Sequence, residues 1–129
     1  MAMPQPRPGI SEYAICESTT SIATTPVAVS AIAPVAGYVQ RGMAAAAGTT
    51  TGTVTVAVSI NNGSDIFNST LTVAAGSNAR AGTVVELPLL GAGTTSGVFV
   101  NEGDCITFTP SGGTGASIGG AFSLVIRGL

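Results

Sequence analysis

The residues with the clearest capacity for chemistry are Glu102, Asp104 and Cys105, which lie together in the stretch VNEGDCITFTP. Two neighbouring carboxylates can act as a general acid and a general base. A cysteine beside them can supply a nucleophile once its thiol is deprotonated, and carboxylate oxygens are ligands for calcium. The stretch therefore raises three alternatives: an acid–base pair beside a nucleophile, part of a metal site, or a polar corner between two strands.

The rest of the chain supplies few groups that could complete such a site. Only 8% of the 129 residues are charged, and the sequence has no His and no Lys. The usual base for activating a thiol and the nitrogen ligands of a zinc site are therefore missing. Calcium held by Asp65, Glu102 and Asp104 stays open as an alternative. Because residues 101–104 are mostly turn formers, we interpret the stretch as a corner, and we predict no catalytic residue, no metal site, no cofactor and no small-molecule substrate.

Cys16 and Cys105 are the two cysteines of the chain. No secretory signal pattern precedes them, because the amino-terminal MAMPQPRPG carries prolines where such a signal needs an apolar run. Two cysteines in this context are more often reduced thiols than a disulfide. We predict that both stay free and face the packed interior as small apolar side chains.

Composition and charge argue against two classes of partner. The formal net charge is −2, and the four basic residues are arginines spread along the chain, whereas nucleic-acid binding needs clustered cations. No apolar run approaches the roughly 20 residues of a membrane-spanning helix. We therefore predict no nucleic acid and no membrane as partners. Low charge together with 45% hydrophobic residues gives little protection against self-association, which favours a subunit covered by its own copies or by a larger shell over a lone small β-domain.

Gly and Pro divide the chain into short segments rich in Val, Thr and Ile, which favour strands. The clearest alternation is TVTVAVSI, which predicts an inward face of Val54, Val56, Val58 and Ile60. Gly42 and Gly48 leave the alanine run of residues 44–47 too short for a stable helix, so it is also read as strand. The other expected strand segments are residues 12–18, 26–34, 37–48, 69–78, 82–93, 96–100, 105–110 and 121–127. The pattern predicts an all-β fold, a jelly-roll-like β-sandwich of about eight strands.

An extended arm, residues 1–10, is expected to precede a single sandwich domain, residues 11–129. Pro4, Pro6 and Pro8 fix their own φ and push the residues before them toward extended geometry. Arg7 is the only charged side chain of the arm. An arm of this kind either folds back on its own domain or lies on a neighbour. We name Pro4, Pro6, Arg7 and Pro8 as the candidate partner-binding residues.

Five segments together resemble small proteins encoded in the structural gene clusters of tailed phages. They are PRPG…EYAI, AIAPVAGYVQRGMAAAAGTTTGTVTVAVSINNGSDI, ELPL, VFVNEGDCITFTPSGGTG and AFSLVIRGL. The similarity extends over nearly the whole chain. It implies a virion protein of the capsid decoration (cement) or head-fibre-like family with a jelly-roll-like β-domain.

The resemblance implies a non-enzymatic function, in which the protein binds the phage capsid surface and cements neighbouring capsid subunits. Proteins of this kind commonly sit as trimers on three-fold positions of the head, so the implied partners are the major capsid protein and further copies of the chain in a homotrimer. The implied location is the virion, on the capsid surface, after synthesis in the host cytoplasm. The resemblance also implies that the arm, Met1 to Gly9, docks on the shell.

An alternative function is that of a carbohydrate-binding or adhesive β-sandwich module of a phage fibre. Sugar sites usually need aromatic platforms, and the sequence has no Trp. Phe99, Phe108 and Phe122 lie within strand patterns and are expected in the core. Tyr38 is the candidate for a surface contact.

Overall fold

The computed structural model describes residues 12–66, 71–74, 84–86, 98–115 and 117–128. These residues form nine strands. The strands are β1 (Glu12–Thr19), β2 (Val29–Ile32), β3 (Gly37–Ala46), β4 (Val54–Ile60), β5 (Leu71–Val73), β6 (Val84–Glu86), β7 (Val98–Val100), β8 (Cys105–Ser111) and β9 (Gly120–Gly128). Across these ranges, no helix has the length and apolar character needed to cross a membrane.

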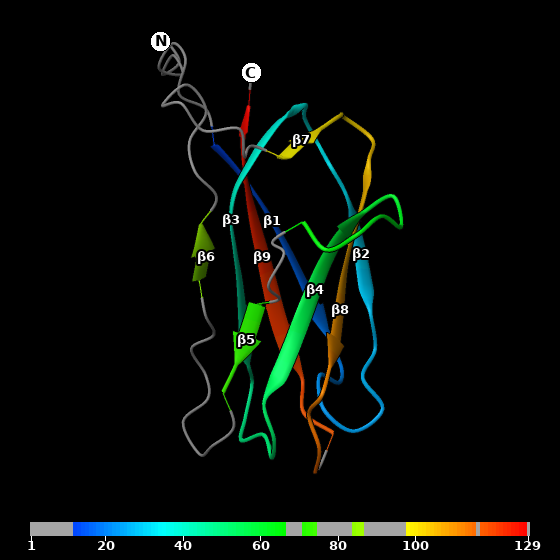
Figure 1. Ribbon diagram of the computed structural model, residues 1–129, viewed down its shortest axis with the longest axis vertical. Helices are drawn as coiled ribbons and strands as arrows, with labels where there is room; N and C mark the ends of the chain where they lie inside the picture. The colour runs from blue at the N-terminus through cyan, green and yellow to red at the C-terminus, as the bar shows by residue number, and fades with distance from the viewer. Residues whose placement is uncertain (1–11, 67–70, 75–83, 87–97, 116, 129) are drawn as a thin grey trace, which may run out of the picture.

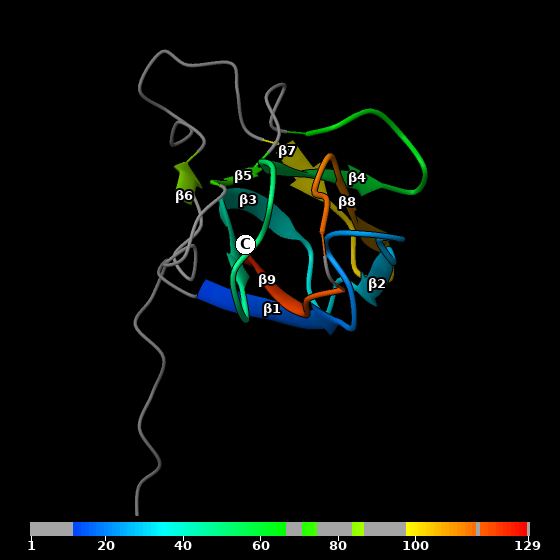
Figure 2. The same ribbon diagram turned by 90° about the horizontal axis from the view of Figure 1, so that it is seen from below.

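Two antiparallel sheets pack face to face. The first has the order β1-β9-β3, and β7 and β6 pair with successive parts of the far edge of β3, at Gly37–Val39 and Arg41–Met43. The second sheet has the order β2-β8-β4-β5. The end view places β1 and β9 in one layer and β4 and β8 in the other (Figure 2). The predicted β-sandwich is confirmed, with nine strands in the described residues where the sequence predicted about eight.

The strand pairs are nested along the chain. β1 pairs with β9, β2 with β8, β3 with β7 and β6, and β4 with β5. The start of β1, the end of β9 and β7 therefore lie at the same end of the molecule (Figure 1). Each sheet combines strands from the two halves of the chain, so neither half can complete a sheet alone.

The core lies between the sheets and is built from alternate residues of the strands. Val54, Val56 and Val58 of β4 are fully buried, as the alternation predicted. Phe108 of β8 and Phe122 of β9 stack across the two layers with ring centroids 5.2 Å apart, which confirms their expected core positions. This apolar contact joins the middle strands of the two sheets.

The alanine-rich segment after Gly37 is a strand, as predicted, and it contains a bulge. The register against β9 shifts between Val39 and Arg41, so one extra residue lies in β3 at this point. Val39 faces inward before the shift, and Ala44 and Ala46 face inward after it. The bulge thereby keeps both halves of β3 packed on the core.

The expectation that both cysteines face the interior was wrong. Cys16 and Cys105 are both exposed free thiols, in different sheets. Ile15 takes the inward position in β1, and Ile106 takes it in β8. Successive side chains of a strand point to opposite faces, so each cysteine lies on the outer face of its sheet.

Phe99, which was expected in the core, is 40% exposed on the outer face of β7. Its neighbours Val98 and Val100 face inward instead. The predicted segment 26–34 contributes a shorter strand, Val29–Ile32, and Val27 before it is exposed.

Candidate functional site

The corner at residues 101–104 is a structural turn, as interpreted from the sequence. The Asp104 side chain accepts hydrogen bonds from the backbone N–H of Asn101 at 2.9 Å and from the side-chain amide of Asn61 at 3.1 Å. Gly103 has φ of +92°, a value that favours glycine. The Gly103 N–H donates to the carbonyl of Ala33 at 2.9 Å. The carboxylate of Asp104 is therefore used to hold the turn.

The pKa of Asp104 is lowered by this arrangement. The backbone N–H of Asn101 is the main cause, and the side-chain amide of Asn61 adds to it. Both donors stabilise the ionised carboxylate. A carboxylate kept ionised in this way is poorly suited to act as a general acid near neutral pH.

A second turn, residues 60–63, is fixed to this corner. Asn61 and Asn62 have φ of +51° and +62°, and the N–H of Gly63 donates to the carbonyl of Ile60 at 2.9 Å, which makes a type I′ turn. The side-chain oxygen of Asn61 accepts a hydrogen bond from the N–H of Cys105 at 2.9 Å. The two turns thus form one hydrogen-bonded unit at the end of the second sheet.

Metal ligands do not assemble at this corner. In the part of the chain that the structure describes, no three His, Cys, Asp or Glu side chains come together as a possible metal site. Asp65, Glu102 and Asp104, the residues of the calcium alternative, all fall within that part. They therefore do not form the calcium site that the sequence left open.

The outer face of the first sheet carries mainly small side chains. Strand register aligns its residues in rows: Ser18 with Ala121 and Ala45, Cys16 with Ser123 and Met43, and Ala14 with Val125 and Arg41. We call this surface the small-residue face. The Cys16 thiol lies on it, 3.8 Å from the hydroxyl of Ser123. The rows of Ser18 and Cys16 contain no charged residue, so this part of the face can approach a partner closely with little charge to desolvate.

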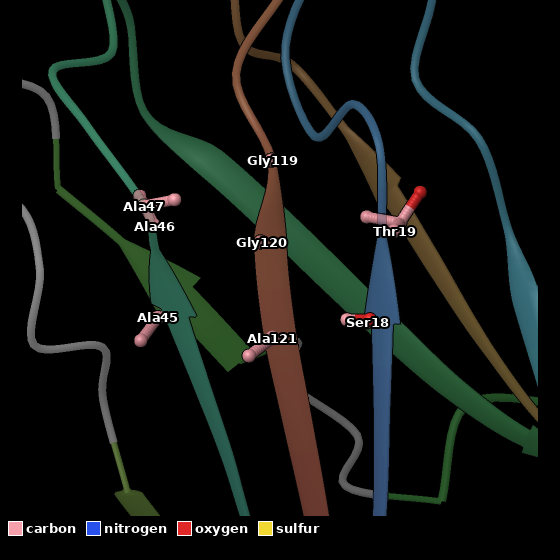
Figure 3. Close-up of a pocket in the computed structure, with 8 residues that line it drawn as sticks. All are labelled: Ser18, Thr19, Ala45, Ala46, Ala47, Gly119, Gly120 and Ala121. Carbon is pink, nitrogen blue, oxygen red and sulfur yellow. The ribbon is translucent and has the colours of Figure 1, made fainter.

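A shallow trough lies at one end of this face, across β1, β9 and β3. Its volume is about 320 Å³, and Figure 3 shows its lining residues, Ser18, Thr19, Ala45, Ala46, Ala47, Gly119, Gly120 and Ala121. None of these side chains is charged. The hydroxyl of Thr19 already donates to the carbonyl of Val27 at 2.8 Å. The trough lacks the converging polar groups of a small-molecule site and is a continuation of the small-residue face.

The opposite end of the same sheet carries a row of larger side chains. Glu12, Arg127, Tyr38 and Phe99 occupy directly opposed positions on β1, β9, β3 and β7. We call this the cross-strand row. The rings of Tyr38 and Phe99 meet edge to face, with centroids 5.1 Å apart and planes inclined at 69°. Tyr38 is half-buried and Phe99 is exposed, so an aromatic pair is available on the surface.

Tyr38, the candidate for a surface contact, therefore lies at the surface beside a second aromatic ring. Sequence reasoning missed that second ring because Phe99 was assigned to the core. Val98, Phe99 and Val100 are all apolar, so the sequence carried no signal that placed Phe99 outward. The candidate arm residues Pro4, Pro6, Arg7 and Pro8 lie outside the described residues.

Comparisons of the chain with models of protein families, with curated proteins and with solved structures each found no match.

Proposed function

We propose that this chain is a non-enzymatic virion structural protein with a jelly-roll fold, which binds the surface of a phage capsid and cements neighbouring capsid subunits. The nested strand order is the observation that carries this proposal. In the two sheets, β1-β9-β3-β6 faces β2-β8-β4-β5. A long ribbon folded over on itself pairs its first strand with its last and its second with the last but one, and this order supports a jelly roll. Jelly rolls recur in viral capsid proteins and in lectins.

The small-residue face supports attachment by surface contact. The rows of Ser18 and Cys16 on this face have no charged side chain, so a partner can bury their apolar area without leaving charges unpaired. We propose that this face, on β1, β9 and β3, packs against the shell. The major capsid protein is the proposed partner.

Self-association is part of the proposal. Large hydrophobic side chains are exposed at several separate places: Tyr13, Val27, Ile32 and Phe99. A chain with 45% hydrophobic residues and a net charge of only −2 has little electrostatic protection against self-association. A homotrimer would present three copies of each contact, so that weak individual contacts give a long-lived attachment. In this function the protein acts by non-covalent binding alone, and no covalent bond is made or broken.

The test is co-sedimentation of the purified protein with heads of the phage that encodes it, with light scattering of the free protein. Ala121 and Thr109 are both exposed, on the outer faces of the central strands β9 and β8. We expect Ala121→Arg to reduce attachment at least about tenfold, as expected when a contact worth 1.4 kcal/mol or more is lost. Thr109→Arg, the matched control on the second sheet, is expected to bind like the wild type. Equal binding by both variants would show that the small-residue face is not the attachment surface.

The Tyr38–Phe99 pair favours one second candidate, a carbohydrate-binding or adhesive module of a phage fibre. Exposed aromatic rings can stack on the apolar faces of sugars, and Arg127 lies next to Tyr38 in the cross-strand row. This candidate predicts binding to host-surface polysaccharide that is lost in Phe99→Ser. Polysaccharide binding without capsid binding would replace the first proposal by the second.

A further inference from the structure

Strand β1 lies at one edge of the first sheet. One side of it pairs with β9, and none of the described strands pairs with its other side. The pairing with β9 runs without a register shift from Glu12 with Arg127 to Thr19 with Gly120, so β1 is a long and regular edge strand. The N–H and C=O groups along the unpaired side of such a strand are a template for a further strand.

β1 has only one of the features that commonly keep an edge strand from pairing. Proteins protect such edges with proline, lysine, a bulge or a charged side chain that points inward. β1 contains no Pro, no Lys and no bulge, but Glu17 lies directly opposite Phe122 of β9. Phe122 is buried in the core, and the side chains of directly opposed residues share one face of the sheet. Glu17 is therefore an inward-pointing charge, and it is half-buried.

Neither of the described cations shares a face of the sheet with Glu17. These cations are Arg41 and Arg127. Arg127 lies opposite Glu12, and Arg41 lies in the row of Ala14. Both rows belong to the outer face of the first sheet, whereas Glu17 belongs to the inner face. Within the described residues, the sheet edge thus holds a half-buried carboxylate with no opposite charge on its own face.

The charges of β1 favour a basic partner strand over a second copy of this chain. β1 contains two carboxylates and no basic residue, so the pairing of two β1 strands brings only negative charges to the join. When the cores of both copies lie on the same side, both Glu17 side chains are buried without a cation, which is strongly unfavourable. A Lys or Arg opposite Glu17, with the two Cβ atoms about 4.5–5.5 Å apart, supplies the missing charge.

We propose that the edge of β1 that no described strand covers binds an extended segment of another protein as an additional antiparallel strand, with a Lys or Arg opposite Glu17. The residue opposite Ile15, two positions away on the same face, is apolar, because Ile15 is buried. The recognised segment therefore has an apolar and a basic residue separated by one position. This inference concerns the edge of β1 rather than the small-residue face, and it does not depend on the proposed attachment to a capsid.

Short synthetic peptides with a fluorescent label test the proposal on the full chain. Val and Thr alternate in each peptide, and the central residue, on the valine face, is Lys, Glu or Val. Fluorescence anisotropy at low salt should show that the Lys peptide binds at least about tenfold more tightly than the Glu peptide, with the Val peptide between them. Added salt should reduce this preference, because it screens the attraction between the charges. Equal affinities of the Lys and Glu peptides, or no binding of any peptide, would overturn the proposal.

Two variants assign the preference to one carboxylate. Glu17→Gln removes the charge on the inner face and should bind the Lys and Glu peptides with affinities within about twofold of each other. Glu12→Gln, on the outer face of the same strand, is the matched control and should keep the preference of the wild type. A preference that survives in Glu17→Gln would mean that another charge selects the partner, and the proposal would be wrong.

Amide hydrogen exchange measures whether the peptide binds at β1 and whether a second copy does so instead. In the free protein, alternate amides of β1 should exchange rapidly, because only the side toward β9 is paired. The Lys peptide should slow these amides at least about tenfold. If they are already slow in the free protein, or become slow as the protein concentration rises without peptide, the edge is occupied by the chain itself or by a second copy, and the proposal would be wrong.

Discussion

At the scale of single residues, Gly37 is the described glycine with the least space for a side chain, because β3 approaches β9 there. A Cβ at this position would overlap the carbonyl oxygen of Arg127. Backbone atoms cannot move aside as the end of a flexible side chain can, so the two strands would have to separate. The same strands carry Tyr38 and Arg127, so the geometry of the cross-strand row depends on this contact.

We predict that Gly37→Ala destabilises the fold by about 3 kcal/mol, the upper part of the range for overpacked positions. The midpoint of urea unfolding, monitored by circular dichroism, measures this change. Gly48→Ala is the control, because a Cβ there would meet Ile118 Cγ2 at an ordinary 3.5 Å. Equal stability of the two variants would contradict the close approach of β3 and β9.

Asp104 makes the stability of the corner depend on pH. The N–H of Asn101 and the amide of Asn61 lower the pKa of Asp104 in the folded protein from its ordinary value of 3.8. The unfolded chain therefore takes up this proton at a higher pH than the folded chain does. The stabilisation is complete above pH 3.8 and is lost as the pH falls through the lower pKa of the folded state.

We predict that Asp104→Asn is less stable than the wild type at neutral pH and that this difference shrinks in acid. Asn still offers an oxygen to the N–H of Asn101 but cannot titrate. Urea unfolding midpoints of both proteins between about pH 7 and pH 2 measure the effect. Glu102→Gln, in the same turn, controls for the removal of one negative charge. A constant difference between wild type and Asp104→Asn across this pH range would contradict the prediction.

Whether a strand side chain faces the core or the solvent could be predicted from the sequence at some positions and not at others. Val54, Val56 and Val58 alternate with polar or small residues, so their inward direction followed from the pattern. Val98, Phe99 and Val100 are all apolar, so the pattern contains no contrast that selects the inward side. In β1, the two candidate faces differed little in polarity, and Cys16 was assigned to the interior by residue type. Where neighbours do not differ in hydropathy, only the register of pairing decides the direction.

At the scale of elements, the type I′ turn after β4 depends on the Asn61 side chain as well as on backbone conformation. Both central residues have positive φ, which asparagine tolerates and glycine adopts more easily. Asn61 also bonds to Asp104 and to the N–H of Cys105, so its side chain links the β4 turn to the beginning of β8.

We predict that Asn61→Gly destabilises the protein by about 1 kcal/mol through loss of the bond to the Cys105 N–H. Asn62→Gly is the matched control, because it gives the same gain in backbone freedom and leaves Asn61 in place. It should be neutral or slightly stabilising. Thermal unfolding of the two variants, measured side by side, checks the difference, and equal loss in both would mean that backbone conformation alone fixes the turn.

Most elements could be predicted because turn residues mark their ends. Gly37 and Gly48 bounded β3, and the turn residues Asn61–Asp65 followed β4. The presence of these two strands could therefore be predicted from the sequence. The pairing of strands could not be predicted, since contacts such as Tyr13 with Ile126 join residues more than a hundred positions apart. The bulge in β3 could not be predicted from the sequence either, because it depends on the register of β3 against β9.

At the scale of the whole molecule, the nested strand order joins the first and the last strand of the described residues in one sheet. β1 and β9 pair along their whole length, from Glu12 with Arg127 to Thr19 with Gly120. The described sandwich therefore contains its own hydrophobic core.

We predict that deleting residues 1–9 leaves the sandwich folded and sharply lowers its occupancy on phage heads. The thermal midpoint should change by less than about 4 °C, because a shift of that size corresponds to about 1 kcal/mol in a domain of this length. Occupancy is measured by co-sedimentation at a fixed ratio of protein to heads. Arg7→Ala in the full chain should have an intermediate effect, weakening attachment by about 1–3 kcal/mol if the guanidinium pairs with a buried carboxylate of the shell. If the truncated protein unfolds while its folded fraction still binds heads normally, the arm belongs to the core of the sandwich, and attachment must then depend on the small-residue face alone.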